Sequence, residues 1–177
     1  TTASWDWNAQ YLDQVLAEAR FIRAFLHFEI FRRYDGIPIL NKLSTYEQGD
    51  QGLIISPSGE RQSVASVIEF IVSECEAIKD DLPNSYPAAS EGRTTKGMAL
   101  ALKAKALLYA ASPLYNATTP PISYGDERDS LLCYGNVDNN RWELARVAYA
   151  EAIQWAESNG YQLLDDPVEG KRQSWVL

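Results

Sequence analysis

The chain has 177 residues, of which 46% are hydrophobic and 23% are charged, a composition typical of a folded globular domain and not of a disordered or collagen-like chain. Its 24 acidic and 16 basic residues give a net charge of −8, which would repel a phosphate backbone and so argues against nucleic acid as a partner. No apolar run approaches the roughly 20 residues of a membrane span, so we expect residues 1–177 to form a single soluble domain.

The first predicted helix covers residues 10–34. Aliphatic residues recur there at the three- and four-residue spacing of one helical face, and phenylalanines widen that face. Gly36 and Pro38 are expected to end the helix. Since so little of its surface is polar, we expect the helix to lie inside a layered helical array with only a narrow face in water. The polar stripe consists of Asp13, Arg20, Arg23 and His27.

Three further helices follow, and no segment shows the alternation of a strand. The first has Ser63 as a candidate N-cap and Pro83 as its stop. The second is rich in alanine, so neighbouring backbones can approach it closely. The third ends at Asn159-Gly160, a left-handed stop. The sequence therefore predicts an all-α fold. These helices cover residues 64–82, 95–112 and 140–159.

A partial repeat motif indicates how the helices are arranged. Trp142, Ala145 and Tyr149 have the spacing that opens a tetratricopeptide helix pair. Together with the small residues of the preceding helix, this favours stacked antiparallel helix pairs, with a four-helix bundle as the alternative. The loops 35–60 and 113–139 are longer than compact domains usually contain, and we expect binding there.

Three blocks of sequence resemble the SusD/RagB family of nutrient-binding outer-membrane lipoproteins of Bacteroidetes, and they occur in the family's order. The first block is AEARFIRAF at residues 17–25 with RYDGIPI at 33–39. The second is TTKG at 94–97 with AKALLYAASPLY at 104–115. The third is WELA at 142–145 with GYQL at 160–163.

The resemblance implies a tetratricopeptide-like scaffold without a catalytic role or cofactor. It also implies a lipid anchor at the bacterial cell surface, and capture of glycans for a SusC-like TonB-dependent transporter. Family members are considerably longer, and their signal peptide and lipid-bearing cysteine have no counterpart in these residues. We therefore expect the chain to be a fragment, with a membrane connection only through the anchor.

The first candidate glycan site is Trp5-Asp6-Trp7-Asn8. Two indoles two residues apart offer stacking faces to sugar rings, and the carboxylate and amide offer partners to hydroxyls. The motif also resembles the Trp-x-Trp platform of some starch-binding members. The alternative is that both indoles pack against the start of the first helix.

A second candidate site lies in the loop 113–139, where Tyr115, Tyr124 and Tyr134 offer further aromatic rings. This loop suits contact with sugar, with a transporter or with a weakly bound calcium ion. The spacing of its oxygen ligands fits no calcium-loop motif, so no metal site is predicted. Those ligands are Asp126, Asp129, Asp138 and Asn139.

Enzyme motifs are missing from the sequence: it contains no G-x-S-x-G elbow, H-E-x-x-H pair or phosphate-binding loop. His27, the single histidine, has no partner placed by the sequence for general base catalysis. Two carboxylates facing a cleft would still suffice for a glycosidase. We therefore expect a non-catalytic glycan-binding protein, with a tetratricopeptide-type protein-interaction scaffold as the alternative.

Overall fold

The computed structural model describes residues 9–41 and 59–162, so the candidates Trp5, Asp6, Trp7 and Asn8 lie outside the described residues. Within these ranges the chain is helical and contains no strand, which confirms the predicted all-α class. The α-helices are α1 (Ala9–Tyr34), α2 (Val64–Ile78), α3 (Lys96–Ala111) and α4 (Asn140–Ser158), and the short 3-10 helices are η2 (Ala88–Ser90) and η3 (Glu127–Leu131).

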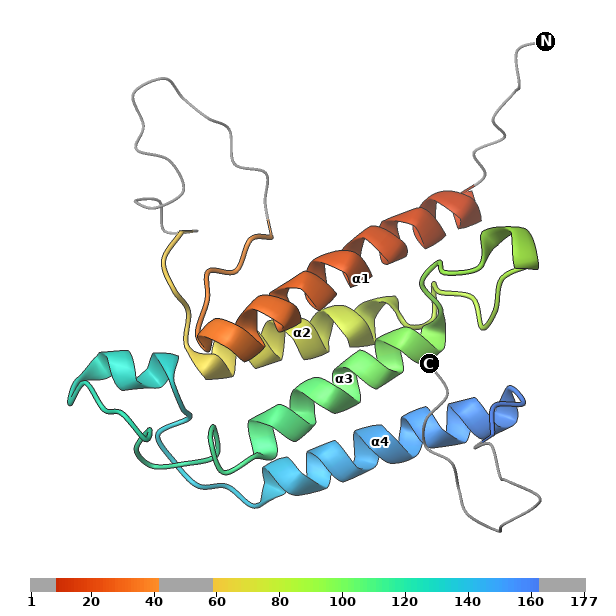
Figure 1. Ribbon diagram of the computed structural model, residues 1–177. Helices are drawn as coiled ribbons and strands as arrows, with labels where there is room; N and C mark the ends of the chain where they lie inside the picture. Colours follow the sequence, from red (N-terminus) through yellow and green to blue (C-terminus); the bar gives the residue numbers. More distant parts are fainter. Residues whose placement is uncertain (1–8, 42–58, 163–177) are drawn as a thin grey trace, which may run out of the picture.

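The four α-helices form a layered array in which neighbours run in opposite directions (Figure 1). The main contacts are those of α1 with α2, of α2 with α3 and of α3 with α4. The first and last helices, α1 and α4, make no contact with each other. A closed four-helix bundle would bring them together, so the described residues form stacked antiparallel helix pairs of tetratricopeptide-like type.

The core lies between α1, α2 and α3. Aromatic rings fill the end of the core near the loop 113–139. There, Phe28 meets Tyr109 edge-on with ring centroids 5.3 Å apart, and Phe31 lies 5.0 Å from Tyr115. Small alanines on α3 and α4 let these two helices pack closely, as the alanine content predicts. The buried alanines of these two helices are Ala99, Ala104, Ala106, Ala110 and Ala111 on α3 and Ala145 and Ala148 on α4.

The helix ends agree with several sequence signals. Ser63 caps α2, and its hydroxyl oxygen accepts a hydrogen bond of 3.1 Å from the Ser66 amide. The helix itself ends at Ile78, four residues before the expected end, and a turn from Ile78 to Asp81 leads to Pro83. Gly160 has a left-handed φ of 80° after α4, as predicted.

The orientation of α1 differs from the prediction that this helix lies inside the array. It is one of the two end helices, and the side that it buries carries Ala17, Phe21, Ala24, Phe28 and Phe31. At the edge of this side, Arg20 and Arg23 reach Glu74 on α2 at 2.9 and 2.6 Å. His27 is buried beside the ring of Phe70. The aliphatic residues lie on the side of α1 opposite its buried phenylalanines, and five of them, Leu12, Leu16, Ile22, Leu26 and Ile30, are 47–60% exposed.

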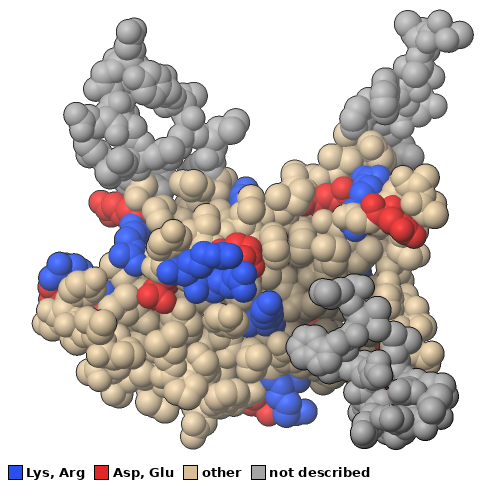
Figure 2. All heavy atoms as spheres, in the orientation of Figure 1, with Lys and Arg blue, Asp and Glu red and all other residues tan. Residues whose placement is uncertain are grey.

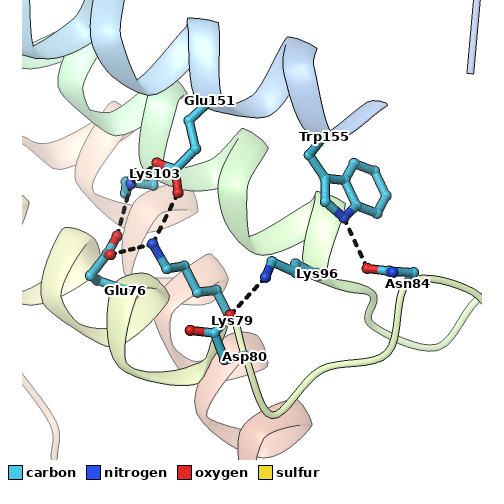
Figure 3. Close-up of polar contacts among 8 residues, drawn as sticks. All are labelled: Glu76, Lys79, Asp80, Asn84, Lys96, Lys103, Glu151 and Trp155. Carbon is cyan, nitrogen blue, oxygen red and sulfur yellow. Dashed lines mark hydrogen bonds and ion pairs between the residues drawn. The ribbon is translucent and has the colours of Figure 1, made fainter. Parts of the chain in front are cut away.

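Charged side chains join the remaining helices (Figure 3). Lys103 on α3 pairs with Glu76 on α2 at 2.8 Å and also with Glu151 on α4. Lys79 at the end of α2 pairs with both carboxylates as well, and lies 2.9 Å from Glu151. Because each lysine contacts carboxylates from two helices, the cluster fixes α2, α3 and α4 relative to one another.

A second polar cluster attaches the loop around η2 to α1. Glu18 accepts hydrogen bonds from the hydroxyl of Tyr86 at 2.6 Å and from Arg93 at 2.8 Å. The Arg93 guanidinium also lies over the Tyr86 ring, 4.9 Å from its centroid.

None of the helices formed by the described residues combines the length and apolarity needed to cross a membrane.

Candidate functional site

A cleft of about 510 Å³ opens at the C-terminal end of α1, between the chain that leaves this helix and the loop 113–139. It combines aliphatic walls with two tyrosines, one carboxylate and one guanidinium. Such a mixture of apolar and polar groups is typical of small-ligand sites. The lining residues are Ile30, Tyr34, Asp35, Gly36, Ile37, Pro38, Arg61, Tyr124 and Leu132.

The wall of the cleft depends on how α1 ends. Asp35 adopts a left-handed φ of 61°, a conformation that aspartate tolerates better than most residues, and its amide still bonds to the Phe31 carbonyl at 2.7 Å. The next residue must be glycine, because a Cβ on Gly36 would lie 2.3 Å from the carbonyl oxygen of Gln62. The left-handed turn and the close approach together direct residues 35–38 along the cleft.

Arg61, which follows the loop after α1 in the sequence, bonds back to this turn. Its Nε donates to the Gly36 carbonyl and its Nη2 to the Tyr34 carbonyl, both at 2.7 Å. A guanidinium has five N–H donors, so donors remain for a ligand. Arg61 thus fixes the turn and brings positive charge to the cleft.

Two exposed tyrosines stand at the cleft. Tyr34 is 64% exposed and Tyr124 is 50% exposed. The Arg128 guanidinium lies over the ring of Tyr124, 4.6 Å from its centroid. Asp129 holds the backbone beside this ring, because its carboxylate accepts from the Tyr124 amide at 2.7 Å and from the Ser123 hydroxyl at 2.6 Å. Tyr124 is therefore positioned by its own loop.

The other two tyrosines of the loop have different environments. Tyr115 is 2% exposed, packs on Phe31 and donates its hydroxyl to Asp35 at 2.8 Å. Burial raises the pKa of this hydroxyl, and so does the bond to Asp35. Tyr134 is half-buried with the Arg141 guanidinium over its ring, 3.8 Å from the centroid. Tyr115 therefore supports the cleft from beneath, and Tyr124 is the predicted tyrosine that lines it.

The loop carboxylates are engaged with protein donors. Asp126 pairs with Arg128 at 2.7 Å, and the Asp138 carboxylate accepts from the Asn140 amide at 2.9 Å. Among residues 9–41 and 59–162, no group of three or more histidine, cysteine, aspartate or glutamate side chains could hold a metal ion.

His27 and Cys75 have structural environments. The His27 Nε2 accepts from the Leu40 amide at 3.0 Å, so the neutral ring carries its proton on Nδ1, which donates to the Arg23 carbonyl at 2.8 Å. Burial raises the pKa of the Cys75 thiol to about 12, which keeps it protonated and unreactive at neutral pH.

Comparison with known proteins shows which solved structures share this fold. No protein-family model matches the sequence, and no curated protein matches it. Among solved structures, a protein named BT4246 superposes with a TM-score of 0.71 at 30% identity, over 89% of this chain and 27% of that chain. A SusD-like protein, BF3747 from Bacteroides fragilis NCTC 9343, gives 0.60 at 25% identity over 89% and 23% of the two chains.

The chain is SusD-like. A further structure, the SusD-like carbohydrate binding protein BF0978 from the same organism, has a TM-score of 0.57 at 20% identity, over 83% of this chain and 22% of that one, a similarity that shows a shared fold. The SusD-like segment thus spans roughly a quarter of the length of the proteins it resembles.

Three residues of this cleft with aromatic or charged side chains, Tyr34, Asp35 and Arg61, were not among the predicted site residues. Tyr34 had a usable signal, because an aromatic residue directly before the Asp35-Gly36 turn lies at a helix end, where its ring can face solvent. Arg61 had no such signal, because it lies 27 residues after Tyr34 in the sequence and reaches the turn through a long-range hydrogen bond.

Proposed function

We propose that the chain is the helical part of a longer bacterial surface protein that binds carbohydrate without transforming it. The observation that carries this proposal is the pair of exposed tyrosines, Tyr34 and Tyr124, at a cleft of a SusD-like fold. Sugar rings present C–H faces that pack on aromatic rings, and hydroxyls that bond to carboxylates and guanidinium groups. Asp35 and Arg61 supply those polar groups.

A binding role fits the cleft better than hydrolysis does. A glycosidase typically uses two carboxylates on either side of the scissile bond. The described lining of the cleft contains one, Asp35, and its carboxylate is engaged by the Tyr115 hydroxyl. Single-site binding of an oligosaccharide needs no second carboxylate.

The family resemblance supports the finer parts of the proposal. The longer protein would be held to the outer membrane by a lipid anchor and would deliver its ligand to a SusC-like TonB-dependent transporter. The predicted platform Trp5-Asp6-Trp7-Asn8 stays a second candidate for sugar contact, and substitution of both tryptophans by alanine tests it in the same titrations.

The test is isothermal titration calorimetry against a panel of soluble polysaccharides. Tyr124→Ala and Tyr34→Ala should each weaken binding by about tenfold or more, since stacking of a ring on an aromatic side chain contributes on the order of 1–3 kcal/mol. Trp142→Ala is the matched control, because Trp142 is an exposed aromatic residue on α4 outside the cleft. Equal affinities of Tyr124→Ala, Tyr34→Ala and the unsubstituted protein would remove the cleft from the binding site.

A protein-interaction scaffold is the second candidate function, and the exposed apolar residues of α4 favour it. On α4, Trp142 and Ile153 are exposed on one flank and Leu144 and Val147 on the other, and among the described helices α4 packs mainly on α3. Exposed apolar surface of this extent is typical of contact sites. Copurification of a transporter with a chain that binds no polysaccharide would support the scaffold.

A further inference from the structure

One side of α1 carries a row of exposed aliphatic residues along nearly the whole helix. Single exposed apolar side chains are ordinary on protein surfaces, but a continuous row over several helical turns is not. At one end of the row, a groove of about 450 Å³ continues it with Pro38 and Leu40. The exposed residues of the row are Leu12, Leu16, Ala19, Ile22, Leu26 and Ile30, and they are called the α1 stripe below.

The α1 stripe has the spacing of a helix-packing surface. Its members follow one another at intervals of three or four residues, so they lie on one face of α1. Ala19 near the middle of the helix lets another backbone approach closely, and Ile22 and Leu26 offer side chains that fit between those of a facing helix. The α1 stripe itself contains no charged residue.

The arginines of α1 nearest the α1 stripe pair with Glu74 on α2 and leave the aliphatic side chains of the stripe exposed. Arg20 and Arg23 both direct their guanidinium groups to Glu74 on α2, and Arg23 borders the groove beside Ile22 and Leu26. Figure 2 shows charged side chains gathered in small groups of both signs, with uncharged surface between them. Arg20 and Arg23 thus serve the contact of α1 with α2, and the aliphatic residues of the α1 stripe are left for another contact.

The position of α1 in the array indicates what makes that contact. The helices are packed in chain order, and α1 is an end of the array. The solved structure BT4246 is matched over 27% of its length, so a protein of that size contains far more polypeptide than the array described. A helical array whose end helix is apolar on its outer side continues with a further helix.

We propose that the α1 stripe is the packing surface for an amphipathic helix supplied by the same polypeptide outside these 177 residues. This rests on the proposal that the chain belongs to a longer protein. The incoming helix runs beside α1 over about five turns, carries aliphatic residues at three- and four-residue spacing, and places a large side chain opposite Ala19. The groove beside Leu40 receives one end of this helix.

Cysteine labelling tests the proposal with a maleimide in the 177-residue chain and in the longer protein. Ile22→Cys reports on the α1 stripe, and Leu16→Cys is a second position in case one variant folds poorly. Glu91→Cys is the control, because Glu91 is exposed and polar. The native Cys75 and Cys133 are each 1% exposed and contribute a slow background.

In the 177-residue chain, all three introduced cysteines should react rapidly. In the longer protein, Ile22→Cys and Leu16→Cys should react at least about tenfold more slowly, while Glu91→Cys keeps its rate, since packed helices open rarely. Equal rates in both proteins would overturn the proposal. Protection that appears only on dimerisation, with a disulfide cross-link between the introduced thiols of two Ile22→Cys chains, would overturn it in favour of a second copy. A chain that binds no polysaccharide would still give these labelling rates. The labelling experiment therefore tests the packing proposal independently of the carbohydrate proposal.

Discussion

Glu74 is a buried carboxylate that two arginines of another helix share. Arg20 donates through Nε and Nη2, and Arg23 donates through Nη2 at 2.6 Å. Burial by itself would raise the pKa of Glu74, but the hydrogen bonds from these guanidinium groups outweigh it and hold the pKa below its ordinary value of 4.5. The ion pairs therefore stabilise the contact between α1 and α2 near neutral pH.

Replacing this carboxylate tests its contribution. Glu74→Gln should lower the free energy of unfolding by about 1–3 kcal/mol, because two partly buried guanidinium groups lose a charged acceptor. Urea denaturation followed by circular dichroism measures the change. Glu29→Gln is the control, since Glu29 bridges Arg32 and Arg33 on the solvent side of the same helix. An equal loss in both variants would contradict a special role for Glu74.

The same carboxylate predicts a pH dependence. A carboxyl group whose pKa is lower in the folded state stabilises that state fully above its unfolded pKa, here near 4.5, and the stabilisation is lost as the pH falls through the folded pKa. The difference in unfolding free energy between the unsubstituted chain and Glu74→Gln should thus be constant from pH 7 to about pH 5 and shrink below about pH 4.5. Denaturation curves across this range measure it. A difference that grows on acidification would reverse the assigned sign.

At the level of the elements, α3 and α4 meet through a glycine and a tryptophan. A Cβ on Gly97 would lie 2.1 Å from the six-membered ring of Trp155. The indole cannot move away freely, because its Nε1 donates to Asn84 at 2.9 Å (Figure 3). Its ring also stacks on Tyr161, with centroids 5.5 Å apart. Gly97 is thus needed for packing, despite the cost of a glycine inside a helix.

A double-mutant cycle separates these two effects. Gly97→Ala alone should destabilise the chain by about 1–3 kcal/mol through overpacking against Trp155. In a Trp155→Ala background the same substitution should stabilise it by up to about 1 kcal/mol, because alanine is the better helix former. Thermal and urea denaturation of the four proteins supply the cycle. The same destabilisation in both backgrounds would show that the ring does not cause it.

The elements were largely predictable from sequence, because they depend on local signals. Periodicity located all four α-helices, and the Ser63 cap and the Gly160 stop are short-range motifs. Which side of α1 faces α2 was not predictable, since it depends on Glu74, 54 residues from Arg20, accepting both arginines. Helix α1 has two apolar sides, and the side with the phenylalanines lies inward while the aliphatic side stays exposed.

The candidate site was predictable in part for the same reason. Tyr124 was found because an aromatic residue in a long loop is a local signal, and it lines the cleft. Tyr115, from the same loop, is buried because it packs on Phe31 of α1, a tertiary contact that its sequence neighbours do not reveal. Arg61 was missed because its role arises from the approach of residues 36 and 62, which only Gly36 allows.

At the level of the whole molecule, the same substitution at two isoleucines distinguishes the core from the α1 stripe. Ile71 on α2 is 0% exposed and Ile22 on α1 is 53% exposed. In the 177-residue chain, Ile71→Ala should therefore cost about 2–5 kcal/mol of unfolding free energy, because it leaves a cavity. Ile22→Ala should change it by no more than about 0.5 kcal/mol, since little packing is lost at an exposed position and alanine favours the helix.

The longer protein should reverse the second result. There the α1 stripe is covered by the incoming helix, so Ile22→Ala should cost about 2 kcal/mol or more, as expected for a packed isoleucine. Urea denaturation of both proteins with each variant gives the comparison, and Ile71→Ala serves as the internal standard because its surroundings are complete in the 177-residue chain. A large cost of Ile22→Ala already in that chain would mean that its own residues cover the α1 stripe. A small cost in both proteins would mean that α1 has a free outer face, and the helical array would then end at α1.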